Sequence, residues 1–208
     1  YDLIRRMNLS KVLIVTNRPS IANSWAEDFK KFIDWHGELS FVSDTDALAG
    51  KPGVLSRDEF VARMRHESRG MIAFESLQGL KGSVYFGGKF DKLAWMAKEY
   101  TDNYGKKQRG IDFDLLIIDD LSSERSTEYA DEIVMNVIDT RYTFGLPLIV
   151  TTNLTSAQMK GEESVSKKRI YSRLYEMTIP LKYTGDDRRK SVMRDNYQKY
   201  KELLHLPG

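Results

Sequence analysis

Runs of apolar residues that end in polar residues are the clearest pattern along this chain. In residues 114–120 (DLLIIDD) four consecutive aliphatic residues precede two carboxylates, and residues 146–153 (LPLIVTTN) also end in a polar tip. Parallel strands that are covered on both faces have this composition, because neither face meets water. The pattern therefore predicts two buried parallel strands.

A helix-like pattern separates these two strands. Residues 128–142 carry apolar side chains at helical spacing, with Ser126 placed to cap the start and Gly145 to end the helix. The apolar positions of its inner face are Ala130, Ile133, Val134, Val137 and Ile138. Strand, helix and strand predict a βαβ unit.

The polar tips of the two strands form the first candidate site. Ligands of parallel sheets bind beyond the carboxyl ends of the strands, so Asp119 and Asp120 would face the Mg²⁺ and phosphates of a nucleoside triphosphate. The amide of Asn153 would lie beside them and orient a water or a γ-phosphate oxygen. Two alternatives stay open: the carboxylates form an ordinary polar turn, and Asn153 caps a helix before Thr155.

A family resemblance rests on these motifs. Residues 113–155 (FDLLIIDDLSSERSTEYADEIVMNVIDTRYTFGLPLIVTTNLT) and 167–177 (KKRIYSRLYEM) resemble the AAA+ ATPase domain of DnaC-type helicase loaders and phage replication proteins. The resemblance implies that Asp119 is the Walker B metal carboxylate, that Asp120 stands where the catalytic acid is usual, and that Asn153 is sensor 1. That acid is usually Glu, and the shorter Asp reaches less far toward an attacking water.

The same resemblance assigns roles to two arginines. The Ser-Arg-Leu piece that contains Arg173 is similar to the box in which AAA+ subunits present an arginine finger to a neighbour's nucleotide, and Arg169 is the second choice for contacting it. Finger arginines stabilise a transferring phosphate. The alternative for both is a solvated or phosphate-binding arginine on a helix.

The first hundred residues also have an α/β pattern. Residues 11–19 (KVLIVTNRP) and 71–77 (MIAFESL) read as buried strands, and Ser20 is placed to cap a helix after the first. That helix has Ile21, Trp25, Phe29 and Ile33 on one face.

These N-terminal motifs resemble another family. Residues 11–25 (KVLIVTNRPSIANSW) and 71–80 (MIAFESLQGL) are similar to the first RecA-like domain of superfamily 2 helicases of the restriction type, over about residues 1–98. The resemblance implies that Asn17, Arg18, Ser76 and Gln78 contact single-strand phosphates; short polar side chains and arginines suit such contacts. The alternative is that they are ordinary loop polars.

The two resemblances meet in a polar, Gly-containing stretch, residues 101–110. They divide the chain into a helicase-like segment, 1–100, and an AAA+ ATPase-like segment, 101–208, which could share one sheet as one domain. No Walker A motif is present, and the nearest stretch, residues 82–90 (GSVYFGGKF), lacks its spacing and hydroxyl. We therefore expect an α/β, P-loop NTPase-like (AAA+/RecA-like) fold with a mostly parallel sheet and flanking helices. The Walker A strand and loop would be missing from it. The chain would then be a fragment or a hybrid of the two families.

The composition of the chain bears on its cellular location and reveals a basic region. The 208 residues include no Cys and no apolar stretch of membrane-spanning length, so we expect a cytoplasmic protein without a membrane partner. Net charge is +2, but residues 160–201 hold twelve Lys and Arg against six Asp and Glu. Within them Arg188 and Arg189, in a glycine and arginine motif similar to that of the loaders, are expected to bind nucleic acid near Tyr183, Tyr197 and Tyr200. The alternative is a solvated helix whose aromatic residues dock it.

Taken together, the sequence predicts an ATP-binding DNA replication factor that resembles a DnaC-type helicase loader. Its cofactors would be ATP and Mg²⁺, and its partners a replicative DNA helicase, single-stranded DNA and further copies of itself in a homo-oligomer. The rival predictions are a fragment of a superfamily 2 DNA helicase or translocase, and an interaction module that binds no nucleotide. A loader should respond to a helicase, whereas a motor should respond to DNA alone.

Overall fold

The computed structural model describes residues 1–16, 18–34, 37–64, 70–76, 99–101, 107–109, 113–121, 128–184 and 197. The chain divides into two compact units, Tyr1–Thr178 and Ile179–Gly208. All helices and strands with given bounds lie in the first unit. None of the described helices is long and apolar enough to cross a membrane.

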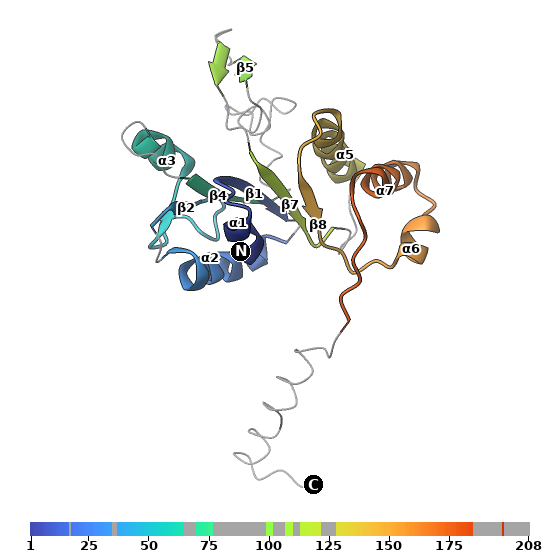
Figure 1. The fold of residues 1–208 in the computed structure, drawn as a ribbon, viewed down its shortest axis with the longest axis horizontal. Coiled ribbons are helices and arrows are strands. Elements are labelled where there is room, and N and C mark those ends of the chain that lie inside the picture. The colour runs from blue at the N-terminus through green and yellow to red at the C-terminus, as the bar shows by residue number, and fades with distance from the viewer. Residues whose placement is uncertain are drawn as a thin grey trace. The chain divides into compact units, whose positions relative to one another are not determined.

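A six-stranded sheet, in which every pair of neighbours is parallel, forms the centre of the first unit (Figure 1). Its order is β3-β2-β4-β1-β7-β8. The bounds are β1 Lys11–Thr16, β2 Leu39–Val42, β3 Val54–Leu55, β4 Gly70–Ser76, β7 Leu115–Asp119 and β8 Leu148–Val150. Two further strands, β5 Glu99–Thr101 and β6 Lys107–Arg109, form a separate antiparallel pair. The fold is thus α/β with a parallel sheet, as expected.

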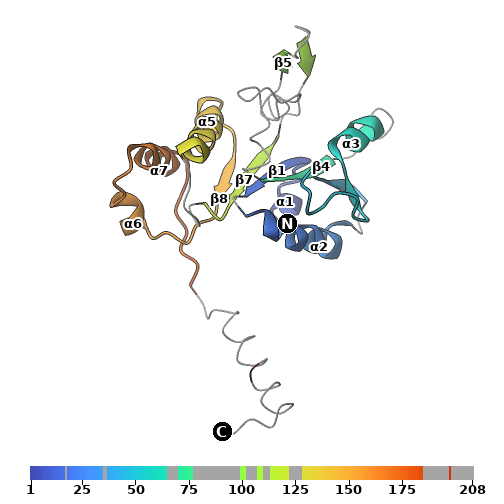
Figure 2. The ribbon, with the colours of Figure 1, turned by 180° about the vertical axis from the view of Figure 1, so that it is seen from behind.

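Helices cover both faces of the sheet (Figures 1 and 2). Their bounds are α1 Asp2–Arg6, α2 Ala22–Phe32, α3 Arg57–Met64, α5 Glu128–Thr143, α6 Ser156–Lys160 and α7 Val165–Met177, with a 3₁₀ turn η1 at Pro19–Ile21. Successive residues of β1 point to opposite faces, so Ile14 packs in the same cluster as Phe29 of α2, whereas Val15 shares a cluster with Ile138 of α5. β1, β4 and β7 are buried along nearly their whole length, which explains their continuous apolar runs. The prediction of a buried strand is wrong for β8, whose residues are only partly buried because it lies at the edge of the sheet.

The predicted βαβ unit is present as β7, α5 and β8. The inner face of α5 is buried at Ile133, Val134 and Ile138. Gly145 follows the helix with φ +61, a backbone conformation that glycine adopts without strain. The predicted cap Ser126 lies outside the described residues.

The structure corrects one predicted helix start and excludes one alternative that the sequence left open. α2 begins after η1, with Ile21 at the N-cap and no side-chain cap, so Ser20 does not cap it. The proline at position 19 opens a 3₁₀ turn that contains Ser20 and shifts the helix start. α6 is capped by Thr155 in a capping box with Gln158, so Asn153 is not the cap.

Arg141 ties the amino-terminal edge of β7 and β8 to α5. It is 7% exposed, and its guanidinium donates to the carbonyl oxygens of Phe113 at 2.9 Å, Pro147 at 2.6 Å and Asp114 at 3.4 Å. The three carbonyl acceptors hold the buried guanidinium at this edge, and the Pro147 carbonyl also accepts from the Leu116 amide of β7 at 3.3 Å.

Candidate functional site

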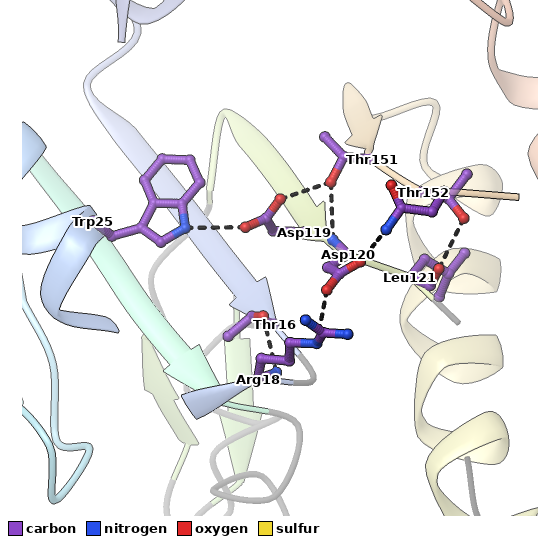
Figure 3. A network of polar contacts seen from close by, with 9 residues as sticks. Thr16, Arg18, Trp25, Asp119, Asp120, Leu121, Thr151 and Thr152 are labelled. Carbon is purple, nitrogen blue, oxygen red and sulfur yellow. Dashed lines mark hydrogen bonds and ion pairs between the residues drawn. The ribbon is translucent and has the colours of Figure 1, made fainter. Parts of the chain in front are cut away.

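The two carboxylates lie at the carboxyl edge of the sheet, as the βαβ pattern predicts. β7 runs between β1 and β8, with Asp119 in register with Thr16 of β1 and Ile118 in register with Val150 of β8. Thr151 therefore follows beside Asp119, and its amide continues the ladder by donating to the Ile118 carbonyl at 2.9 Å. Side chains of three neighbouring strands converge at this edge (Figure 3).

Asp119 accepts one hydrogen bond on each carboxylate oxygen. The hydroxyl of Thr151 donates to Oδ1 at 2.6 Å, and the indole N–H of Trp25 in α2 donates to Oδ2 at 3.1 Å (Figure 3). Both donors are neutral, and no cation among the described residues forms a salt bridge with this carboxylate. The negative charge of Asp119 is thus oriented without being neutralised.

Asp120 has an unusual backbone conformation. Its φ is +60, in the left-handed region that L-residues other than Asn and Asp rarely adopt. Its amide donates to the Thr151 hydroxyl oxygen at 2.9 Å, and the next amide, of Leu121, donates to the Thr151 carbonyl at 2.9 Å. Thr151 therefore holds both acids: its hydroxyl donates to Asp119 and accepts from the backbone of Asp120.

The Asp120 side chain pairs with a cation that follows β1, two residues beyond its end. Nε of Arg18 lies 2.9 Å from Oδ2 of Asp120, with the two side chains 38% and 19% exposed. The Arg18 amide donates to the Thr16 hydroxyl at 3.1 Å, which fixes where the arginine leaves the strand. Nδ2 of Asn153 approaches Oδ1 of Asp120 at 3.4 Å, a long hydrogen bond. The two acids thus differ in charge balance, since within the described part of the chain Asp120 has a cationic partner and Asp119 has none.

This donor set suits Mg²⁺ held together with a phosphate. Mg²⁺ in nucleotide sites is bound by one or two carboxylates and keeps waters and phosphate oxygens as its other ligands. No group of three or more His, Cys, Asp or Glu gathers in the described part of the chain, so a metal held by protein side chains alone does not fit there. Asp119 keeps free lone pairs after its two hydrogen bonds, because a carboxylate has about four acceptor positions.

Arg173, the predicted finger, has a structural setting in α7. Its Nε donates to Asp139 of α5 at 3.1 Å, its NH1 group to Glu176 at 3.1 Å, and its guanidinium lies 4.5 Å from the centre of the Tyr142 ring. The hydrogen bond to Glu176 is the main cause that raises the pKa of Arg173. Arg169, one turn earlier in α7, is exposed. Among the described residues, neither arginine forms an ion pair with Asp119 or Asp120 of the same chain.

The predicted nucleic-acid contacts are only partly described. Asn17, Gln78, Arg188 and Arg189 lie outside the described residues. Ser76 is 5% exposed at the end of β4, so its side chain offers little surface to a nucleic acid. Arg18, predicted for the same role, is partly exposed and forms an ion pair with Asp120, and its role toward nucleic acid stays a prediction.

The sequence analysis did not predict two residues of the site, Thr151 and Trp25. The sequence places Thr151 in the polar tip of a strand but predicts no contact for it, because threonine is common after strands. Trp25 was assigned to the apolar face of a helix, which is correct for its ring, since it packs against the cluster that contains Phe29. Its contact with Asp119 spans 94 positions, and no local pattern contains that information.

One solved structure is similar in fold, a crystal structure of the DnaC helicase loader. The two share 17% sequence identity and a TM-score of 0.36, over 82% of this chain and 76% of that one. No family model and no curated protein matches the sequence.

Proposed function

We propose that this chain is a Mg²⁺-dependent, ATP-binding factor of DNA replication that acts in the manner of DnaC-type helicase loaders. One observation carries the nucleotide part: at the carboxyl edge of a parallel sheet, the Thr151 hydroxyl bonds both the Asp119 carboxylate and the Asp120 backbone amide, and no cation among the described residues pairs with Asp119. That edge is where parallel sheets bind ligands. The replication part rests on the sequence resemblance of residues 111–206.

The two acids have different roles in this proposal. Asp119 would hold Mg²⁺ together with phosphate oxygens, and the chemistry the bound ion would supply is neutralisation of phosphate charge. Asp120, with Asn153 beside it, orients the attacking water. Arg18 balances the charge of Asp120 and stands ready to pair with a phosphate, because a guanidinium binds phosphate and carboxylate alike. Hydrolysis is slow, since Asp120 is shorter than Glu and is already paired.

The contact between subunits is proposed for α7. Arg169 is exposed, whereas use of Arg173 would cost its bonds to Asp139 and Glu176. These contacts favour Arg169 as the residue that reaches a neighbour's phosphate in a homo-oligomer.

The test is binding of a fluorescent ATP analogue at increasing Mg²⁺ concentrations. Asp119→Asn removes the charge and keeps the size of the side chain, so we expect the Mg²⁺-dependent part of binding to disappear. Asp2→Asn is the matched control, because Asp2 lies in an exposed pair with Arg6 and its loss should change nothing. Binding that is equal in both variants would refute the proposed metal site.

The partner decides between the loader and the rival motor. Stimulation of ATP turnover by a replicative helicase, with little response to single-stranded DNA alone, is the expected result. Stimulation by DNA alone would support a superfamily 2 motor fragment. If the unaltered chain binds no nucleotide, the result would support the third hypothesis, an interaction module without a nucleotide site.

A further inference from the structure

Trp25 connects α2 to the carboxyl edge of the sheet. Its ring contacts the ring of Tyr1 edge to face at 5.6 Å, and its backbone carbonyl accepts the Tyr1 hydroxyl at 2.7 Å. The side chain is only partly buried, and the polar end of the indole is turned to Asp119 (Figure 3). Packing therefore fixes the ring, and the fixed ring aims one N–H at one carboxylate oxygen.

This contact has a directional consequence for Asp119. Trp25 donates from α2 to Oδ2, and Thr151 donates from the end of β8 to Oδ1, so the carboxylate is held by two different elements. With one donor on each oxygen, rotation of the carboxylate would break at least one bond. Indole N–H is a donor only, so it cannot take up a metal itself. The Trp25 N–H can instead determine which lone pairs of Asp119 remain available to a metal ion.

We infer that Trp25 is a positioning residue for Asp119 and sets the affinity of the site for Mg²⁺ with nucleotide. The inference rests on the proposed function, which makes Asp119 the metal ligand. Groups that hydrogen-bond to metal ligands orient them, and their loss costs typically about 10–100-fold in metal affinity. A carboxylate left with the Thr151 bond alone can rotate about that bond and loses its orientation.

A purely structural role for Trp25 makes a different prediction. If the ring only packs against Tyr1 and the neighbouring cluster, a phenylalanine of similar shape should preserve both folding and Mg²⁺ response. If instead the N–H blocks the carboxylate, its removal should tighten Mg²⁺ binding. Only positioning predicts weaker Mg²⁺ binding in a folded variant.

The experiment compares Trp25→Phe with Tyr1→Phe in the full chain. Tyr1→Phe removes the hydrogen bond to the Trp25 backbone without touching Asp119, so it controls for loss of a nearby contact. The readout is the Mg²⁺ concentration that gives half-maximal binding of the fluorescent ATP analogue, with the thermal midpoint of each variant as the check on folding. We expect a rise of about tenfold or more for Trp25→Phe and no change for Tyr1→Phe.

A second measurement follows the Trp25 indole signal in the unaltered chain and uses the variants only to assign that signal. The chain has three Trp residues, and the indole N–H signal missing in the NMR spectrum of Trp25→Phe, or the one most altered in Asp119→Asn, belongs to Trp25. That signal should move on titration with MgCl₂ and the ATP analogue. An unchanged or lower half-maximal Mg²⁺ concentration in Trp25→Phe, or a fixed indole signal while the nucleotide binds, overturns the role of Trp25 alone. Failure of the unaltered chain to bind Mg²⁺ and nucleotide overturns the proposed function, and the inference with it.

Discussion

Replacing Thr151 by valine tests how far one hydroxyl organises the acid pair. The substitution keeps the branched shape and removes two hydrogen bonds, the 2.6 Å donation to Asp119 and the 2.9 Å acceptance from the Asp120 amide. A hydrogen bond to a charged group is worth about 1.5–3 kcal/mol and a neutral one about 0.5–1.5 kcal/mol. Because Thr151 is exposed, water replaces much of both, and we expect a loss of about 1–2 kcal/mol in the free energy of unfolding.

The assay is urea unfolding of three proteins: the unaltered chain, Thr151→Val and Thr151→Ser. Serine keeps the hydroxyl and loses a methyl group, so its unfolding free energy should stay within about 0.5 kcal/mol of the original. Valine should also abolish Mg²⁺-dependent nucleotide binding under the proposed function, since both acids lose a common support. Equal stability of the valine and serine variants would refute the role given to the hydroxyl.

Four further predictions follow from single contacts. Arg141→Met removes the hydrogen bonds from the buried guanidinium to the Phe113 and Pro147 carbonyls and should lower the unfolding free energy by about 2–4 kcal/mol in urea, whereas the exposed Arg6→Met should change it by under about 0.5 kcal/mol. Gly145→Ala meets no atom within 4 Å but must adopt φ +61, so we expect a loss of about 1–2 kcal/mol by the same assay. A double-mutant cycle of Arg173→Gln and Asp139→Asn should give a coupling energy of about 0.2–1 kcal/mol, and zero coupling would show that this ion pair between α7 and α5 does not stabilise the fold. The pKa of Glu59 is lowered chiefly by the hydrogen bond from the Ser56 amide, so its contribution to stability is lost as the pH falls below the ordinary range of Glu, and Glu59→Gln should flatten that acid dependence.

Much of the fold was predictable because the central strands are buried on both faces. A strand such as β7 needs apolar side chains in succession, and this requirement is visible in four adjacent residues. The helix between β7 and β8 was predictable for a similar reason, since its inner face repeats at helical spacing. The start of α2 was not predicted correctly. A 3₁₀ turn that begins at Pro19 precedes the helix, and capping preferences alone do not predict such a turn.

The site was predictable only where it follows from strand ends. Asp119, Asp120 and Asn153 could be placed at one edge because parallel strands end on the same side. The partners of these acids could not be placed, because the order of strands in a sheet is a long-range property. Nothing near Arg18 in the sequence indicates that β1 lies beside β7, about a hundred positions away, or that its guanidinium meets Asp120.

The shared edge connects the two segments of the chain that carry different resemblances. The N-terminal segment supplies Arg18 and Trp25, and the C-terminal segment supplies both acids and Thr151. Each acid therefore receives one partner from each half: Asp119 from Trp25 and Thr151, and Asp120 from Arg18 and, through its backbone, Thr151. Because β1 is also hydrogen-bonded directly to β7, this edge cannot form from residues 101–208 alone in the state described. Whatever the origin of the two segments, the chemistry of the acid pair belongs to the combined sheet and should be tested only in the full chain.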